Sequence, residues 1–431
     1  MQSSFDALII GAGPAGSTAA ILLSRAGWSV GLVERQSFPR RKVCGECIAA
    51  SNLPLLHALG LGPAFEAAAG PELRQVVLMR GSRAVRADLP SRADPRHPWG
   101  RALGRETLDT LLIEQARLAG ATVLQPWSVR AVEGSAGDWR MAVRAVDHGA
   151  ALCLHAPVAI AAHGSWEALP AGRPQRRRAR SASDLFAFKA HFRGATLEAG
   201  LLPVLSFNGG YGGMVVADAG ITTLACCIRR DRLDAARAAQ PGTRAGGVVE
   251  ALLMRECAGV RTVLEAARRD GPWLAAGPID PGISLSAGDG PFRIGNAAGE
   301  AHPIIGEGMS MAMQSAWLLC GQLLGADGFA RPAAADLQRE QALHYAAQWR
   351  RHFAPRLRLA AVFAHLAMRP MGAAALMALS RAWPPLLTLG ASWGGKTRCA
   401  VEAELISLLS RAESRPAAPA SASHFRSLAR A

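Results

Sequence analysis

The N-terminal part of the chain alternates short apolar runs with small, turn-forming residues. Ala7 to Ile10 is an apolar run of the kind that forms a buried parallel strand. A helix is predicted from Pro14 to Gly27, because proline is tolerated at the first helical position and glycine commonly follows a helix end. A second apolar strand closes at Glu34. The pattern predicts a strand–turn–helix–strand unit.

The turn between this first strand and the helix holds Gly11, Gly13 and Gly16 in the spacing G-x-G-x-x-G. Gly11 permits a tight turn, Gly13 lets the backbone approach a diphosphate, and Gly16 lets the helix pack on the strand. The helix N-terminus then points at the phosphates, and Glu34 is placed to accept hydrogen bonds from ribose hydroxyls. Because that carboxylate repels a 2′-phosphate, the unit predicts FAD or NAD. The expected cofactor contacts in this unit are Gly11, Gly13, Pro14, Ala15, Gly16, Glu34 and Arg35.

Between Asp184 and Arg230 the chain alternates apolar and polar residues with the period of a β-strand. Four such segments, punctuated by glycines, read LFAFKAHF, LLPVLSF, YGGMVVAD and ITTLACCIRR. They predict the antiparallel sheet of a substrate domain.

From Leu357 to Leu409 the chain is apolar, with arginines only at intervals, and predicts a C-terminal helical region. Two interpretations are open: helices packed over the core, or peripheral contact with a membrane. No uncharged apolar run reaches the ~18 residues of a spanning helix. Residues after Arg411, rich in alanine, serine and proline, predict a disordered tail.

The chain has 431 residues, of which 50% are hydrophobic, enough for two connected domains. Its net charge of +15 comes from arginine and favours anionic partners such as NADPH phosphates or acidic lipid headgroups. The basic run RPQRRRAR, from Arg173 to Arg180, lacks interleaved aromatic residues. We interpret it as a solvated loop and expect neither a nucleic-acid partner nor an obligate protein partner.

Eight cysteines at irregular spacing give no disulfide framework and are typical of a reducing compartment. Only ten residues precede Gly11, and the first strand occupies several of them, so no signal peptide is expected. We expect a cytoplasmic protein, with membrane association as the alternative.

A second glycine-rich segment, FRIGNAAGEAHPIIGEGMSMAMQSAWLL, runs from Phe292 to Leu319. It predicts a strand, a proline-containing turn and a helix with Met309, Met313 and Ala316 on one face. Together with the N-terminal unit, it resembles the glutathione-reductase-like FAD fold of single-component flavin monooxygenases and the geranylgeranyl reductase family. In those families the segment reads G-D-A-A-G/H and then P-x-x-G-x-G, and Asn296 stands here in place of the aspartate. The resemblance implies FAD contacts at Gly295, Asn296, Gly306, Gly308 and Met309.

Three shorter segments extend the resemblance. FPRRKVCG, from Phe38 to Gly45, is similar to the FPRxKxCG segment of geranylgeranyl-reductase-like flavoproteins, which approaches flavin and substrate. RETLDTLL resembles the R-x-x-L-D-x-x-L helix start of the monooxygenase fold, whose arginine is Arg105 here. APVAIAAHGS resembles v-I-x-A-D-G-x-x-S, with His163 where an aspartate is usual. The resemblance thus adds Lys42 and Arg105 to the expected cofactor contacts.

Cys44 and Cys47 form C-G-E-C, which is open to two interpretations: a dithiol facing the flavin, or a pocket-lining cysteine beside a small buried hydrophobe. Glu46 between them either orients substrate or lies on the surface. No metal site is expected, because the pair at Cys226 and Cys227 lacks the spacing of zinc ligands. The catalytic candidates beside the flavin are Cys44, His302 and Pro303.

The predicted fold class is α/β: a Rossmann-like FAD-binding domain interleaved with an antiparallel-sheet substrate domain, followed by a C-terminal helical region. The FAD-binding domain is expected at residues 1–75, 96–166 and 275–325, the substrate domain at 76–95 and 167–274, the helical region at 326–410 and the tail at 411–431. In the resembling families the antiparallel sheet forms one wall of the substrate pocket. Its candidate lining residues are Phe186, Phe188, His191, Phe207 and Tyr211.

The chain has one dinucleotide fingerprint, so NAD(P)H is expected as a transient reductant. The expected function is that of a FAD-dependent monooxygenase acting on a lipophilic aromatic or polyketide-type small molecule. The alternatives are a flavin-dependent ene-reductase of polyprenyl chains and a non-catalytic flavin-binding protein. A flavin halogenase is disfavoured, because the sequence holds no W-x-W-x-I-P motif.

Overall fold

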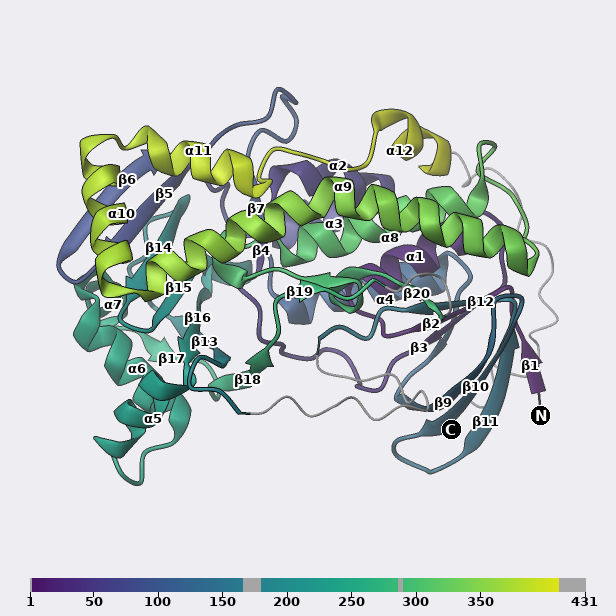
Figure 1. Ribbon diagram of the computed structural model, residues 1–431, viewed down its shortest axis with the longest axis horizontal. Coiled ribbons are helices and arrows are strands. Elements are labelled where there is room, and N and C mark those ends of the chain that lie inside the picture. Colours follow the sequence, from purple (N-terminus) through teal and green to yellow (C-terminus); the bar gives the residue numbers. More distant parts are fainter. Residues whose placement is uncertain (1, 166–179, 286–289, 411–431) are drawn as a thin grey trace.

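The computed structural model describes residues 2–165, 180–285 and 290–410. It confirms the α/β class: a parallel sheet, a larger sheet and a set of C-terminal helices pack into one body (Figure 1). Most of the basic run from Arg173 to Arg180 lies outside the described residues, and so does the expected tail at residues 411–431.

The N-terminal unit forms the centre of a five-stranded sheet in the order β20-β12-β2-β3-β8, with every neighbouring pair parallel. Successive residues of β2 point to opposite faces: Ala7 and Ile9 face the helices, whereas Leu8 and Ile10 face a smaller sheet in the order β1-β11-β10-β9. A strand covered on both faces needs apolar side chains in both directions, which explains the uninterrupted run ALII. The strands of the two sheets are β1 (Gln2–Ser4), β2 (Ala7–Ile10), β3 (Val30–Val33), β8 (Thr122–Leu124), β9 (Trp127–Ser135), β10 (Asp138–Ala145), β11 (Ala151–Ala156), β12 (Val158–Ala161) and β20 (Phe292–Arg293).

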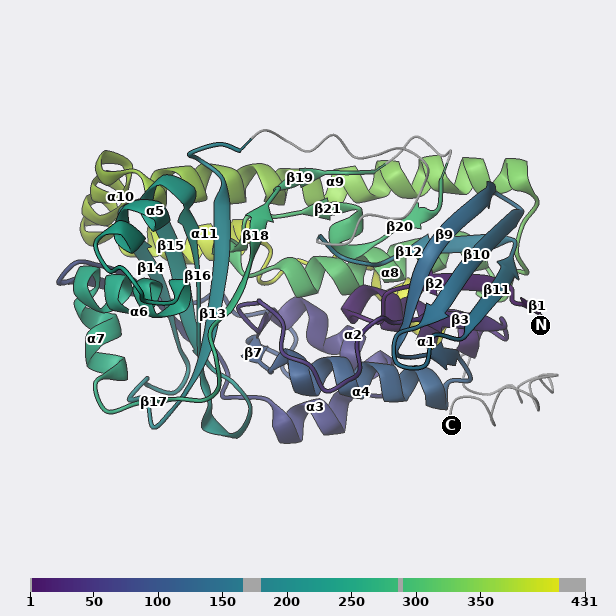
Figure 2. The same ribbon diagram turned by 90° about the horizontal axis from the view of Figure 1, so that it is seen from below.

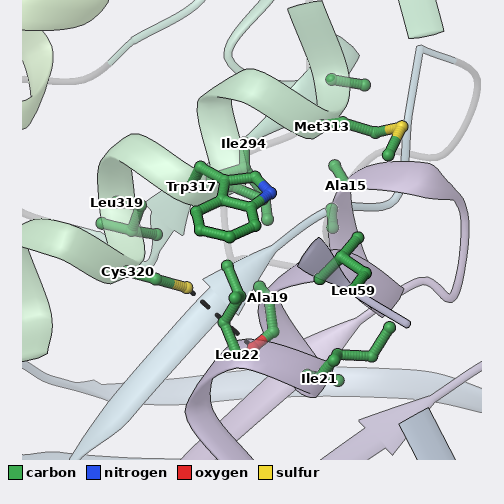
Figure 3. Close-up of a cluster of buried hydrophobic side chains, with 14 of the residues drawn as sticks. Ala15, Ala19, Ile21, Leu22, Leu59, Ile294, Met313, Trp317, Leu319 and Cys320 are labelled. Carbon is green, nitrogen blue, oxygen red and sulfur yellow. Dashed lines mark hydrogen bonds between the residues drawn. The ribbon is translucent and has the colours of Figure 1, made fainter. Parts of the chain in front are cut away.

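Three helices pack together against this parallel sheet: α1 (Pro14–Arg25), α4 (Arg105–Leu118) and α8 (Gly308–Leu324). Small residues Ala15 and Ala19 on α1 let α8 approach closely, and the buried indole of Trp317 fills the space beside Leu22 (Figure 3). This packing holds the first residues of α1 and α8, Pro14 and Gly308, at the same cavity.

The second large sheet has eight strands, in the order β17-β13-β16-β15-β14-β5-β6, with β18 also paired to β13. Helices α5 (Arg230–Ala238), α6 (Ala245–Glu256) and α7 (Ala258–Leu264) belong to this part of the molecule, and α6 and α7 pack on one face of the sheet (Figure 2). Its strands are β5 (Gln75–Arg80), β6 (Arg83–Asp88), β13 (Leu185–Arg193), β14 (Leu201–Phe207), β15 (Gly210–Val216), β16 (Thr222–Arg229), β17 (Arg268–Arg269) and β18 (Leu274–Ile279).

Two details of this sheet differ from the sequence prediction. The sheet is mixed rather than antiparallel, because β14 runs parallel to β5, a strand that falls almost wholly in the segment 76–95 expected in the substrate domain. In addition, β18 pairs with β13 rather than with the parallel sheet, so the segment expected to re-enter the FAD-binding domain at residue 275 first completes the larger sheet. Both pairings join distant segments, which local alternation does not reveal.

The C-terminal region is helical, and its longest helix, α9, runs the length of the molecule along both sheets (Figures 1 and 2). The helices are α9 (Ala335–Met368), α10 (Pro370–Ala382), α11 (Pro385–Gly394) and α12 (Ala403–Ser410). In the part of the chain that the structure describes, no single helix has the length and apolarity to cross a bilayer; only α9 and α10 together do, and they are bent by 105°.

Short elements complete the fold around the cavity between the sheets. They are β4 (Cys47–Ile48), α2 (Leu53–Ala58), α3 (Gly62–Ala68), β7 (Arg101–Ala102), β19 (Gly282–Ile283) and β21 (Gly299–Glu300), with single 3₁₀ turns at Ala50–Asn52, Asp218–Gly220, Gly295–Ala297 and Pro303–Ile305.

Candidate functional site

A cavity lies between the parallel sheet and the larger sheet, and both sequence motifs open into it. From the expected cofactor contacts, the structure places at this cavity Gly13, Pro14, Ala15, Lys42, Arg105, Gly295, Asn296, Gly306, Gly308 and Met309. Its opposite wall comes from β13 to β16. The segments that sequence analysis singled out separately therefore converge on one site.

The three glycines of the first turn have different surroundings. A Cβ on Gly11, where φ is +97°, would lie 2.7 Å from the carbonyl oxygen of Ala162, and one on Gly16 would lie 1.9 Å from the Gly11 carbonyl oxygen. A Cβ on Gly13 would meet only the tip of Arg105, at 3.7 Å. Gly11 and Gly16 are therefore required by the protein's own packing, whereas Gly13 faces space into which a ligand can approach.

Glu34 is held at this turn by the backbone. One carboxylate oxygen accepts a hydrogen bond from the Ala12 amide at 2.9 Å, and the other accepts one from the Gln36 amide at 2.9 Å. The side chain of Arg35 leaves in another direction, into an exposed crevice lined by Arg130 and Arg144. The structure thus keeps Glu34 beside the glycine turn and places Arg35 away from the main cavity.

Three cations surround the glycine turn. Arg105 makes a bidentate ion pair with Asp109, through Nε at 2.8 Å and Nη2 at 2.7 Å. Arg40 lies between Glu34, at 3.8 Å, and Asp109, at 3.7 Å. Burial, together with the charges of Arg105 and Arg40, lowers the pKa of Lys42 to about 8. An anion bound at the turn would relieve this repulsion, which is the electrostatic setting that a diphosphate needs.

Asn296 and His163, the two residues that depart from the family pattern, lie near each other. Asn296 donates a hydrogen bond from Nδ2 to the Ser165 hydroxyl at 2.9 Å, which leaves its amide oxygen as an acceptor. Among the described residues, the buried Nδ1 of His163 has no hydrogen-bond partner. Burial and the charge of Arg293 lower the pKa of His163 to about 4, so the ring is neutral at pH 7. Asn296 therefore keeps an oxygen acceptor on the cavity, whereas His163 offers no charge.

One cation that was not predicted from the sequence lines the cavity from the C-terminal region. Lys396 Nζ lies 3.2 Å from a carboxylate oxygen of Glu307, 3.4 Å from the Gly306 carbonyl oxygen and 3.4 Å from Cys47 Sγ. Burial raises the pKa of Glu307, and Cys47 and Glu307 raise the pKa of Lys396 above its ordinary value despite burial. The only signal in the sequence was the rarity of lysine, of which the chain has three.

Glu46 lines the cavity and does not lie on the surface, but its carboxylate is taken up by hydrogen bonds within the protein. Its carboxylate is buried and accepts hydrogen bonds from Lys189, from Thr223, from the Arg105 amide at 2.9 Å and from His191 Nε2 at 3.2 Å. Burial alone would raise the pKa of Glu46, but the hydrogen bond from His191 and the charge of Lys189 lower it to about 2. Glu46 is therefore a structural anion, whose hydrogen bonds hold its loop against β13, β16 and α4.

The two cysteines of C-G-E-C both line the cavity and both are free thiols. Cys47 contacts Lys396, and burial raises the pKa of its thiol. The geometry leaves both interpretations of the pair open.

The pocket wall contains only part of the expected set. Phe188 and Tyr211 line the cavity. Phe186 and Phe207 pack with the core on the helix-covered side of the sheet. His191 hydrogen-bonds to the Glu46 carboxylate and does not line the cavity. Phe186 and Phe188 are two residues apart on β13, so alternation places them on the same face and separates both from His191. Phe188 packs in the same cluster as Phe207 and also borders the cavity.

Of the two catalytic candidates at the second glycine-rich turn, only one lines the cavity. Pro303 lines the cavity, whereas His302 lies behind Tyr211, whose hydroxyl is 3.3 Å from His302 Nδ1. Burial, with a contribution from His365, lowers the pKa of His302 to about 4.

One cluster outside the cavity bears on metal binding. His57, Glu66 and His97 bring three candidate ligand atoms within 4.8 Å of one another, with His57 Nε2 2.9 Å from Glu66 Oε1. These residues lie on α2, α3 and the segment after β6, and none lines the cavity.

Comparison with known proteins agrees with this site. Residues 4–199 match the family described as FAD binding domain. A tryptophan 2-halogenase of Chondromyces crocatus is 33% identical over 133 residues, which are 31% of this chain and 25% of that protein. A menaquinone reductase of Mycobacterium tuberculosis is 34% identical over 130 residues, 29% of each chain. A kynurenine 3-monooxygenase of Stenotrophomonas maltophilia is 39% identical over 124 residues, 27% of this chain and 26% of that protein. The matched regions thus span less than a third of these relatives' own length.

Solved structures match over nearly the whole chain. A myxobacterial chondrochloren halogenase, a FAD-dependent enzyme, superposes with a TM-score of 0.71 at 19% identity, covering 95% of this chain and 97% of its own. A geranylgeranyl bacteriochlorophyll reductase-like protein from Thermoplasma acidophilum superposes with a TM-score of 0.63 at 15% identity, covering 99% of this chain and 100% of its own. The chain has the fold of FAD-dependent oxidoreductases, and its N-terminal part matches an FAD binding domain. Assignment to the geranylgeranyl reductase group does not follow from these likenesses.

We predict that Glu46→Gln destabilises the fold by about 3–5 kcal/mol, because it leaves the Lys189 ammonium buried without a counter-charge. The pKa of Glu46 in the fold, about 2, lies below its ordinary value of 4.5. Its contribution is therefore complete above pH 4.5 and is lost as the pH falls toward 2. Denaturant unfolding of wild type and variant across this range measures both effects.

Glu198→Gln is the matched control, because Glu198 forms an exposed pair with Arg86 at 2.6 Å. It should change the free energy of unfolding by less than about 1 kcal/mol. Equal stability and equal acid dependence of wild type and Glu46→Gln would contradict a structural role for Glu46.

Proposed function

We propose that this protein is an FAD-dependent monooxygenase that uses NAD(P)H as a transient reductant and acts on a lipophilic small molecule. The observation that carries the proposal is the single cavity that joins the glycine turns and their cations to an apolar wall of the larger sheet. One end of this cavity suits a dinucleotide, and the other suits an apolar substrate.

The residues on the cavity fit FAD. Gly13 leaves room for a diphosphate, Arg105 and Lys42 supply positive charge beside it, and Glu34 lies at the turn where ribose hydroxyls are bound in this fold. The free amide oxygen of Asn296 can accept a hydrogen bond from the ribityl chain. FAD, when bound, supplies two-electron redox chemistry that no side chain provides.

The substrate end of the cavity presents no charged side chain from the larger sheet. Ala187, Leu202 and Val204 contribute apolar surface. Burial raises the pKa of Tyr211 and Cys226 well above their ordinary values, and raises that of Cys227 to about 12. All three are neutral at pH 7. A wall of this kind excludes water from the reacting centre and favours an apolar substrate, as oxygen insertion requires.

The sequence holds one dinucleotide fingerprint, and the single five-stranded parallel sheet of the described residues carries it. A nicotinamide coenzyme therefore has no second dinucleotide-binding sheet there, which supports a reductant that visits and leaves.

A second candidate is ene reduction of a polyprenyl chain, and the Tyr211 to His302 contact favours it. Hydride addition to an alkene needs an acid to complete it. Tyr211 lines the cavity, and its hydroxyl lies 3.3 Å from Nδ1 of His302. The similarity to a geranylgeranyl bacteriochlorophyll reductase-like fold and to menaquinone reductases supports the same candidate.

The reaction class is tested with the FAD-loaded protein by recording NADPH oxidation and oxygen uptake together while lipophilic phenols, quinolones and polyprenyl compounds are added. A monooxygenase shows substrate-stimulated oxygen uptake and no product under anaerobic conditions. Anaerobic product formation identifies the ene-reductase, and a requirement for chloride or bromide identifies halogenation. No NADPH oxidation with flavin bound would support a non-catalytic flavoprotein.

Three charged side chains, those of Lys396, Glu307 and Arg356, lie close together beside Gly306. Within this proposal, Lys396 affects the reduction potential of the bound flavin. Glu307 is flanked by Lys396 at 3.2 Å and lies within electrostatic range of Arg356. The Nη1 atom of Arg356 has no hydrogen-bond partner in the part of the chain that the structure describes. The three side chains sum to one positive charge when all are ionised. Positive charge in a partly buried site favours an electron-rich cofactor over its oxidised form.

We predict that Lys396→Met lowers the two-electron midpoint potential of the bound flavin by about 20–60 mV, the equivalent of ~1–3 kcal/mol. Lys396→Arg, which keeps the charge, should shift it by less. Spectroelectrochemical titration of the FAD-loaded variants measures the potential. An unchanged or higher potential in Lys396→Met would rule out this role.

A further inference from the structure

Helix α10 is apolar on the face that it exposes. Its exposed residues recur at intervals of three and four, so they form one stripe along the helix, and Trp383 follows at its end. The stripe consists of Met371, Ala374, Ala375, Ala378, Leu379 and Ala382. Met371 is 87% exposed and Leu379 59%. A helix on a solvated surface normally keeps its outer face polar, so this face is arranged for a different environment.

The apolar surface continues onto the end of α9. Val362 and Leu366 are exposed there, and Leu366 Cδ2 lies 3.2 Å from where a Cβ of Gly372 would stand, so it is adjacent to the start of α10. The two helices meet at a sharp corner at one end of the molecule (Figures 1 and 2). Five of the eleven large exposed hydrophobic residues in the described ranges fall in this region: Val362, Leu366, Met371, Leu379 and Trp383. Clustering of this kind marks an interaction site, whereas single exposed hydrophobic residues do not.

The charge of this region has one sign. Residues 341–401 contain no aspartate or glutamate and eight arginines or lysines. Arg351 and Arg358 are exposed on α9, Arg369 is exposed at the bend between α9 and α10, and Arg381 is exposed near the end of α10. The stripe is thus bordered by cations.

We propose that the α9–α10 corner is a docking surface for an anionic phospholipid bilayer. The apolar stripe would lie at the boundary of headgroups and acyl chains, with the arginines at the lipid phosphates and Trp383 at the interface, the depth that indole prefers. In this arrangement the two helices lie on the membrane surface rather than across it, because α9 buries one side, including Tyr345, Trp349 and Phe353, inside the protein.

A second copy of the chain suits this surface less well. A two-fold interface places the same patch on both sides, so Arg369 and Arg381 would face the same cations of the partner with no acidic side chain in residues 341–401 to compensate. Anionic lipid supplies the missing charge.

The same helices connect the surface to the cavity. On its inner side α10 packs Met377 into a cluster with Leu376 and Val204, and Val204 lines the cavity. In α11, Leu387 and Ala391 pack beside Leu202 and Val204. If the proposed function holds, a lipophilic substrate dissolved in the bilayer has a short path to the site. The docking surface itself does not depend on the reaction.

The test is co-flotation of the full-length protein with phosphatidylcholine vesicles and with vesicles that also contain phosphatidylglycerol, using apoprotein and FAD-loaded protein in parallel. Binding is expected only to the anionic vesicles and with either form of the protein. The double variant Met371→Glu/Leu379→Glu should reduce the bound fraction at least tenfold. Arg369→Gln/Arg381→Gln should weaken binding about fivefold for each arginine removed.

The matched control is Leu118→Glu/Leu343→Glu, since these residues are 81% and 56% exposed but lie away from the corner. It should bind as wild type does. Equal loss of binding in the control, or undiminished binding of the stripe variant, would overturn the proposal. So would a dimer in solution that the stripe variant dissociates, because the stripe would then join two copies. Unchanged flavin absorbance of each variant shows that the site remains intact.

Discussion

The buried carboxylate of Glu46 joins the first glycine turn's side of the cavity to the larger sheet. It lies on the loop after the first βαβ unit, and its partners come from β13, β16 and the first turn of α4. It also has a positive φ of 60°, a conformation unusual for a residue with a side chain. Because its neighbours Cys44, Gly45 and Cys47 line the cavity, the ion pair with Lys189 determines where the larger sheet stands relative to the glycine turn.

Charge is distributed unevenly around the cavity that this link creates. Lys42 and Arg105 lie at the first glycine turn, and Lys396 lies at the second. Between them the wall of the larger sheet is neutral, with Tyr211 and Cys227 held protonated by burial. This is the distribution expected for a ligand with an anionic diphosphate, a redox ring that gains negative charge on reduction, and an apolar substrate beside it.

The sequence predicted the parts of this arrangement that depend on local spacing. The glycine turn, the strand before it and the helix start at Arg105 follow from residues within one or two turns of each other, and the structure brings them together as expected. Contacts between distant segments were not predictable: Lys189 lies 143 residues from Glu46, and Lys396 lies 90 residues from Gly306. One signal was available, since Lys189 and His191 fall on the same face of a strand that is otherwise apolar, and two ionisable groups there require a buried partner. The sequence also did not reveal which face of each strand turns toward the cavity: Tyr211 lines it, whereas Phe207 packs with the residues of α6 and α7.

The central claim, that FAD occupies the cavity at the first glycine turn, is tested most directly by titrating FAD into wild type and Gly13→Ala. A Cβ on Gly13 has ordinary room within the protein, with Arg105 at 3.7 Å as its only neighbour, so the variant should unfold at the wild-type denaturant concentration. A diphosphate that approaches this backbone would meet the added methyl group, and we predict an affinity for FAD at least tenfold weaker, about 1.4 kcal/mol or more. Equal affinity in the two proteins, or no binding of FAD by the wild type, would contradict the account.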